Sequence, residues 1–302
     1  MFFRSVSQSR YHASPKTVLS PELEQFTDSD KIAANKANYH EFDWTPNRHE
    51  QEALERVRNM FLDINLSHAT ASNPERLQRD GILPFDQMVD TGRNDWKSQT
   101  FPLDQSLGLH RYVFFHWGAF YPTWYGHHVF PIDSRKVLLS PNTIVTPDDL
   151  SAQMLPMNSE ASALDEHEQE RLNRYLDTIL SGSDWVEVIA RRSLQYMQRS
   201  CGYDSYPVKH RTDMGEIKHL GTISPQLLGD WVDINNEDAK HSIGRIMIEE
   251  NGVTVPYVTN ALDTEEQDPS KSNNNKLPHE IGADSEKSRR LWREILNIAQ
   301  KS

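Results

Sequence analysis

The segment His110–Asp133 constrains the fold of this chain more than any other. It concentrates aromatic side chains, four histidines and two glycines in a chain that is only 9% aromatic overall. Tyr, Trp and His combine an apolar body with a polar edge, so they suit both a dense core and a wall that binds a ligand. The segment therefore predicts either a pair of core strands or a binding surface, and its spacing alone favours the core.

Two strands joined by a loop are the expected structure of this segment and its N-terminal neighbour. Leu107–Phe115 is a near-continuous apolar run, which is typical of a strand buried on both faces. Alternation along such a strand places His110, Tyr112 and Phe114 on one face. His127–Asp133 predicts the second strand.

Helical periodicity marks much of the remaining chain, where apolar residues recur at the spacing of one helix face. The predicted helices cover Pro21–Asn38, Arg48–Ile64, Leu164–Leu180, Trp185–Gln198 and Ser288–Ala299. Further expected elements are strands at Lys136–Ser140 and Glu216–Leu220, a helix opening at Pro147 with Thr146 as its N-cap, and a hairpin within 243–258. Residues 67–105 are polar and turn-rich, so we expect them to be mostly loop with short elements. Because the order lacks βαβ alternation, we expect an α+β fold.

Composition excludes several classes of partner. Lys and Arg total 32 against 44 Asp and Glu, giving a net charge of −12, which argues against general binding to nucleic acid or anionic membranes. No segment approaches the roughly 20 apolar residues of a membrane helix. Cys201 is the single cysteine, so no internal disulfide can form. We expect a monomer without nucleic-acid or membrane partners.

Four regions are expected along the chain: a disordered leader at 1–20, a helical N-terminal region at 21–105, a core at 106–262, and a polar linker with a C-terminal helix at 263–302. The leader contains basic residues and serines but no acidic residue. That composition fits a mitochondrial transit peptide, a leader recognised by bacterial injection systems, or a frayed terminus.

Histidines raise the possibility of a metal site, since imidazole is the commonest transition-metal ligand. His110, His116, His127 and His128 lie close in sequence. Adjacent residues on a strand point to opposite faces, so at most one of His127 and His128 can face a site. We therefore assign no metal ligand and keep a His-metal hydrolase as an alternative. The common P-loop, GxGxxG, CxxC, HExxH and GxSxG motifs are absent.

A ligand cleft is a second interpretation of the same residues. A histidine beside aromatic rings, such as His110 near Phe114, can hydrogen-bond a ribose hydroxyl while the rings stack on a flat heterocycle. Tyr121 and Tyr125 stand four apart and share a face if their loop is helical. An ordinary core for His110 and a solvated surface position for Glu216 stay open from spacing alone.

Three segments, in this order, resemble the mono-ADP-ribosyltransferase toxins: LHRYVFF, then WYGHHVFPID with NTIVTPDDL, then GEIKHLGTISPQLL. In that family a first core strand carries a His or Arg that holds the NAD ribose, a second strand lines the nicotinamide pocket, and a late strand carries a catalytic Glu. The first segment also resembles the arginine ADP-riboxanase effectors. Met214 stands two residues before Glu216, so the ExE pattern of arginine-specific toxins is absent.

The resemblance implies an ADP-ribosyltransferase-like split β core with a helical N-terminal region and inserted helices. It implies NAD as substrate, a host or target protein as acceptor, and Glu216 and His110 as catalytic residues. The residues implied to bind NAD are His110, Arg111, Phe114, Tyr121, Tyr125, His128 and Thr146. It also implies a toxin or effector, secreted by a non-classical route into the cytoplasm of a target cell. The alternatives are a cytoplasmic or mitochondrial location, and an inactive interaction protein on the same fold.

Overall fold

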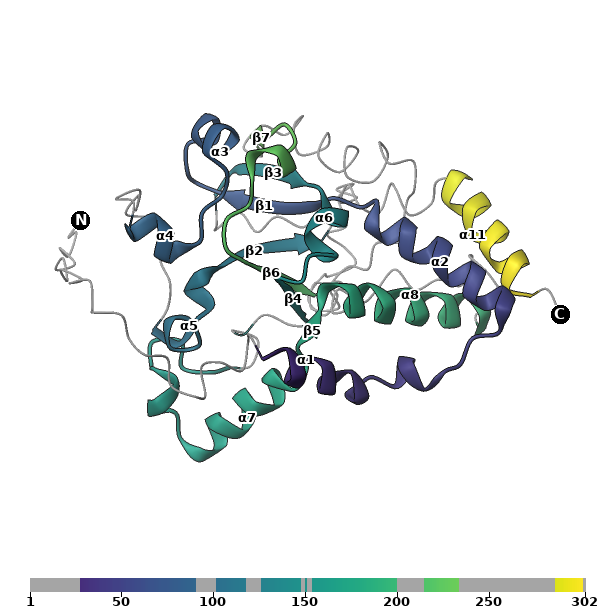
Figure 1. Cartoon of the computed structure of the whole chain (residues 1–302), viewed down its shortest axis with the longest axis horizontal. Coiled ribbons are helices and arrows are strands. Elements are labelled where there is room, and N and C mark those ends of the chain that lie inside the picture. The colour runs from purple at the N-terminus through teal and green to yellow at the C-terminus, as the bar shows by residue number, and fades with distance from the viewer. Residues whose placement is uncertain are drawn as a thin grey trace, which may run out of the picture.

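Helices enclose one antiparallel sheet in the computed structural model, which describes residues 28–90, 102–117, 126–147, 150, 154–199, 215–233 and 286–300 (Figure 1). The strands are β1 (Leu66–Thr70), β2 (Tyr112–Trp117), β3 (His128–Ile132), β4 (Thr143–Thr146), β5 (Leu180–Ser181), β6 (Glu216–Leu220) and β7 (Val232–Asp233). The α-helices are α1 (Ser29–Asn35), α2 (Arg48–Leu62), α3 (Pro74–Asp80), α4 (Phe85–Asp90), α5 (Pro102–Ser106), α6 (Ser134–Leu138), α7 (Glu166–Leu176), α8 (Gly182–Arg199) and α11 (Glu286–Ala299). This mixture confirms the α+β class.

The strands follow the order β5-β4-β6-β2-β1-β3-β7 across the sheet, and each pairing is antiparallel. β1 pairs with β3 along its whole length. It pairs with β2 only where Leu66 faces Trp117 and Ser67 faces His116. The sheet therefore splits between β1 and β2 beyond Ser67.

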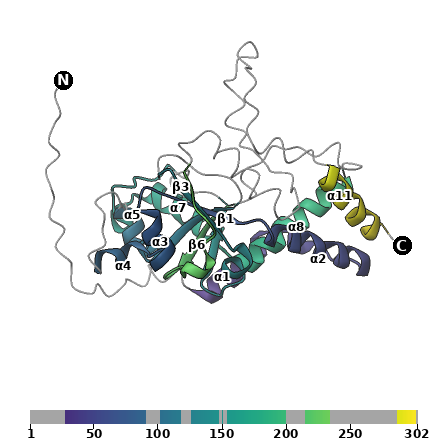
Figure 2. The same ribbon diagram turned by 90° about the horizontal axis from the view of Figure 1, so that it is seen from above.

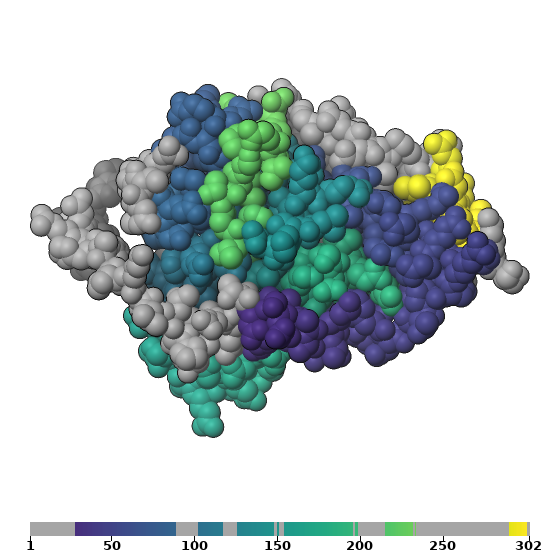
Figure 3. Space-filling view, in the orientation of Figure 1, coloured from purple at the N-terminus to yellow at the C-terminus, as the bar shows by residue number. Residues whose placement is uncertain are grey.

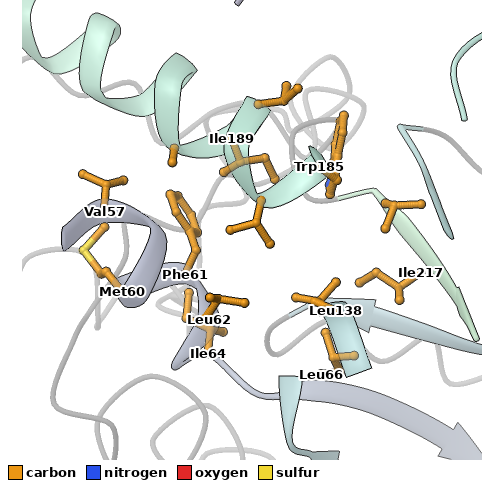
Figure 4. Packing of buried hydrophobic residues seen from close by; sticks show 14 of the residues in the cluster. Val57, Met60, Phe61, Leu62, Ile64, Leu66, Leu138, Trp185, Ile189 and Ile217 are labelled. Carbon is orange, nitrogen blue, oxygen red and sulfur yellow. The ribbon is translucent and has the colours of Figure 1, made fainter. Parts of the chain in front are cut away.

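One face of the sheet packs against α2, α8 and α11. Asn47 starts α2 through a capping box: its side chain accepts from the backbone N–H of Glu50, whose carboxylate accepts from the backbone N–H of Asn47. The apolar side of α2 then meets α8 and the sheet, with Phe61 and Trp185 buried between them (Figure 4). Figure 2 shows the three helices gathered on one side of the molecule, and Trp292 of α11 is fully buried in the same core.

The opposite face packs against α7 and the segment around α5. A second capping box, formed by Asp165 and Glu168, starts α7. Tyr112 and Ile144 from the sheet and Tyr175 from α7 belong to one buried cluster on this side. The sheet is thus covered on both faces, as the apolar character of β2 requires.

Most of the predicted elements are confirmed. The helices expected around 48–64, 164–180, 185–198 and 288–299 are α2, α7, α8 and α11, and the strands at His127–Asp133 and Glu216–Leu220 are β3 and β6. The described part of the first predicted helix forms α1 and a 3-10 turn, Lys36–Asn38. The hairpin expected within 243–258 lies outside the described residues. No helix in the described ranges is long and apolar enough to cross a membrane.

The strand predicted at Leu107–Phe115 starts too early. Gly108 adopts a left-handed φ of 75°, and Leu109–Arg111 form a 3-10 turn. The extended backbone begins only at Tyr112, so His110 does not lie on the strand and does not share its face with Phe114.

The prediction of a strand at Lys136–Ser140 is wrong. The Asp133 side chain accepts a hydrogen bond from the backbone N–H of Lys136 and so caps a helix, α6. The next strand is β4, and Thr146 is its last residue. Most of the helix expected from Pro147 lies outside the described residues.

The expectation that residues 67–105 are mostly loop with short elements is also wrong, because the described part of this region consists largely of β1, α3, α4 and α5. Strand β1 lies inside the sheet, between β2 and β3. The region 21–105 therefore supplies a strand to the same sheet as the region 106–262, and α11 packs onto the core beside α2 (Figure 3).

Candidate functional site

A buried ion pair on β6 is the centre of the candidate site. Glu216 and Lys218 stand two apart on the strand and therefore share one face. Lys218 is 0% exposed and Glu216 8%. The Lys218 Nζ lies 2.5 Å from Glu216 Oε2, 2.8 Å from Thr146 Oγ1 and 3.2 Å from the Tyr175 hydroxyl oxygen. These three acceptors match the three N–H donors of an ammonium, and we call the four residues the Lys218 cluster.

Strand register assembles this cluster. Thr146 of β4 lies opposite Glu216, and Phe114 of β2 lies opposite Lys218, with the Lys218 Nζ 5.6 Å from the centre of the Phe114 ring. Tyr175 reaches the sheet from α7 and donates its hydroxyl hydrogen to Thr146 Oγ1 at 3.2 Å. The polar atoms around Lys218 thus come from two strands and one helix that are far apart in sequence.

The partners of Lys218 stabilise its positive charge. Burial lowers the pKa of Lys218, but the Glu216 carboxylate outweighs this effect and the net pKa lies above its ordinary value. Burial raises the pKa of Tyr175, so its phenol stays protonated at neutral pH. The cluster therefore encloses an ammonium that favours the ionised form of Glu216.

Three residues implied by the resemblance meet at this cluster: Glu216, Thr146 and Phe114. Lys218 and Tyr175 were not predicted as functional residues. A signal for Lys218 was available, because a lysine two residues after a glutamate on a strand faces the same side. The tyrosine carries no such signal, since its contact depends on how α7 packs on the sheet.

His110 and Arg111 lie at the other end of the β2–β6 pair. Tyr112, which follows them, is opposite Leu220, whereas Glu216 is opposite His116. Four strand residues span about 13 Å, so the structure does not bring His110 beside Glu216. Burial lowers the pKa of His110, which favours a neutral ring in the 3-10 turn.

The other implied NAD-binding residues are not at the cluster. His128 lies on β3, three strands from β6 in the sheet order, which corresponds to about 14 Å. Tyr121 and Tyr125 lie outside the described residues.

His68 occupies the split between β1 and β2. Its Nδ1 lies 2.9 Å from the carbonyl oxygen of Phe114. A carbonyl only accepts, so Nδ1 carries the proton and Nε2 keeps its lone pair. Burial lowers the pKa of His68, which favours this neutral form. The ring also meets Phe115 edge-on at 5.9 Å. His68 was overlooked in the sequence because its strand was read as loop.

Comparisons with known proteins add no relative, because no family model, curated protein or solved structure matches this chain.

Proposed function

We propose that this chain is an NAD-dependent ADP-ribosyltransferase-like enzyme, with an ADP-ribosyltransferase-like split β core, that modifies a side chain of a target protein and uses Glu216 as its catalytic carboxylate. The observation that supports this most is the Lys218 cluster. Glu216 opens β6 and lies opposite Thr146 of β4, and the ring of Phe114 lies 5.6 Å from the Lys218 Nζ. A glutamate at the start of a late strand, with Thr146 and Phe114 near it, is what the sequence resemblance implies.

The reaction requires a stabilised cation. The glycosidic C–N bond of NAD breaks, nicotinamide leaves with the electron pair, and the ribose carbon becomes oxocarbenium-like. A nucleophilic atom of the acceptor side chain then bonds to that carbon and loses a proton. A carboxylate at Glu216 stabilises the positive charge as it develops, and the Lys218 ammonium lies 2.5 Å from its Oε2.

Nicotinamide release tests this proposal. The full-length protein is incubated with NAD and a cell lysate, and released nicotinamide and labelled acceptor protein are measured. We expect Glu216→Gln to lower both by about 100-fold or more. Glu41→Gln is the matched control, because Glu41 is also buried and pairs with Arg192 at 2.7 Å, away from the Lys218 cluster. Wild-type activity in Glu216→Gln refutes the role of Glu216, and the absence of any release by the wild type favours an inactive interaction protein.

A further inference from the structure

We infer that His127, His128 and Asp233 form a site for one divalent transition-metal ion of the zinc class. This site is separate from the Lys218 cluster, because it lies at the β3–β7 edge of the sheet. It requires no transferase activity.

The three side chains already converge. Each offers one ligand atom, and these atoms all lie within 4.8 Å of one another. Two ligand atoms of a tetrahedral zinc ion are roughly 3.3 Å apart, given bonds of about 2.0–2.2 Å. All three residues are half-buried rather than enclosed, so small side-chain rotations can close the remaining distance.

Backbone geometry builds this convergence. Asp233 lies directly opposite His128 in the β3–β7 pairing, where facing side chains are close. His127 precedes β3 and follows Gly126, which has a φ of 136° and approaches β1 so closely that a Cβ would lie 2.0 Å from the carbonyl carbon of Thr70. The expectation that His127 and His128 point to opposite faces is therefore wrong, and their ring centres are 4.1 Å apart.

His128 is oriented as a ligand. Its Nδ1 lies 3.1 Å from the carbonyl oxygen of Ser72, so Nδ1 donates and Nε2 keeps its lone pair. A hydrogen bond from one ring nitrogen to a backbone carbonyl is the usual partner of a metal-bound histidine. The Trp231 ring meets the His128 ring edge-on at 5.1 Å and restricts its rotation.

The donor set selects the kind of metal. Two imidazoles and one carboxylate suit zinc, iron, copper or nickel, whereas calcium and magnesium prefer oxygen ligands. Three protein ligands leave a fourth position of a tetrahedral ion for water or another ligand.

Zinc binding to the full-length protein tests the site, by competition with a chromogenic chelator and by the visible absorption of bound Co²⁺. We expect one ion per chain in the wild type. Asp233→Asn and His128→Gln are each expected to weaken binding at least tenfold. His167→Gln is the matched control, since His167 is exposed on α7 and lies outside the cluster, and it should bind zinc like the wild type.

Two outcomes would overturn the site: no zinc binding by the wild type, or wild-type affinity in both ligand variants. Asp233→Asn is expected to fold like the wild type, because it changes one atom of a half-buried side chain. A variant with the wild-type melting temperature in metal-free buffer and weakened zinc binding supports the site. Glu216→Gln is expected to bind zinc normally, so failure of the transferase proposal leaves this result unaffected.

Discussion

Replacing Lys218 by Met removes the positive charge of the buried ion pair while keeping a side chain of similar length. Thr146 and Tyr175 still hydrogen-bond each other in this variant. Glu216, which is 8% exposed, loses the ammonium that lies 2.5 Å from its Oε2. The stability lost by Lys218→Met therefore reports the cost of removing this ammonium from the buried carboxylate.

The size of this cost follows from the choices open to Glu216. The carboxylate can stay ionised and lose its compensation, which typically costs about 3–5 kcal/mol. It can also take up a proton, which at pH 7 costs about 3.7 kcal/mol for a carboxyl whose ordinary pKa is about 4.3. Protonation sets the upper limit, so we expect a loss of about 3–4 kcal/mol at pH 7 and about 1 kcal/mol at pH 5.

The sign of the pH dependence is fixed by the same reasoning. In Lys218→Met the folded-state pKa of Glu216 rises above the unfolded value, so the penalty is small below about pH 4.3 and grows as the pH rises. In the wild type the pKa of Lys218 is raised from 10.5. Its contribution is fully present below 10.5 and is lost only above it, so it adds no slope between pH 5 and 7.

Urea unfolding, followed by tryptophan fluorescence at pH 5 and pH 7, measures this difference. Lys36→Met is the matched control: Lys36 pairs with Asp184 at 2.8 Å, but their side chains are 44% and 25% exposed. Such an exposed pair contributes about 0–1 kcal/mol. A Lys218→Met penalty that is no larger than this control, or that is equal at both pH values, would refute the reasoning.

Three further variants test other parts of the structure. Gly126→Ala should lower the free energy of unfolding in urea by at least about 2 kcal/mol, because Gly126 has a φ of 136° and a Cβ there would lie 2.0 Å from Thr70. Gly108→Ala should cost only about 1–2 kcal/mol, because Gly108 has a φ of 75° but open space around it. A larger loss in Gly108→Ala than in Gly126→Ala would contradict the close approach of Gly126 to Thr70. Trp292→Ala should cost about 3–5 kcal/mol, since Trp292 is 0% exposed, and a loss below about 1 kcal/mol would mean that α11 does not dock as described. Burial lowers the pKa of His68 in the folded protein. As the pH drops below about 6.5, His68 therefore becomes protonated in the unfolded chain first, and the free energy of unfolding falls. His68→Gln should reduce this fall between pH 7 and pH 5, and an unchanged fall would exclude His68 as its cause.

Helices were predictable from the sequence because their signals are local. The apolar spacing of α2 and α7 comes with capping residues, Asn47 and Asp165, that mark where each helix starts. Glu216–Leu220 was likewise recognisable as a short strand. These signals depend on neighbours within a few residues along the chain.

The missed features depend on distant residues. LSHAT has little strand character of its own, and β1 is extended because β3 pairs with its whole length. The Lys218 cluster requires β4, β6 and α7 to meet, which no local pattern describes. His110 was predicted to lie on the strand because the apolar run is nearly continuous, but Gly108 turns the backbone before the strand begins.

The position of β6 between β2 and β4 has a consequence for how the protein is made. Val113 and Phe115 of β2 are the pairing partners of His219 and Ile217, which leave the ribosome only after the chain has grown by about a hundred residues. At about 5–20 residues per second this takes about 5–20 seconds. During that interval the β6-facing edge of β2 has no native partner, and a nascent chain with such an open strand edge is prone to aggregate. Solubility during expression should therefore respond to translation speed between residues 117 and 220 and to the supply of chaperones that bind unfolded chains.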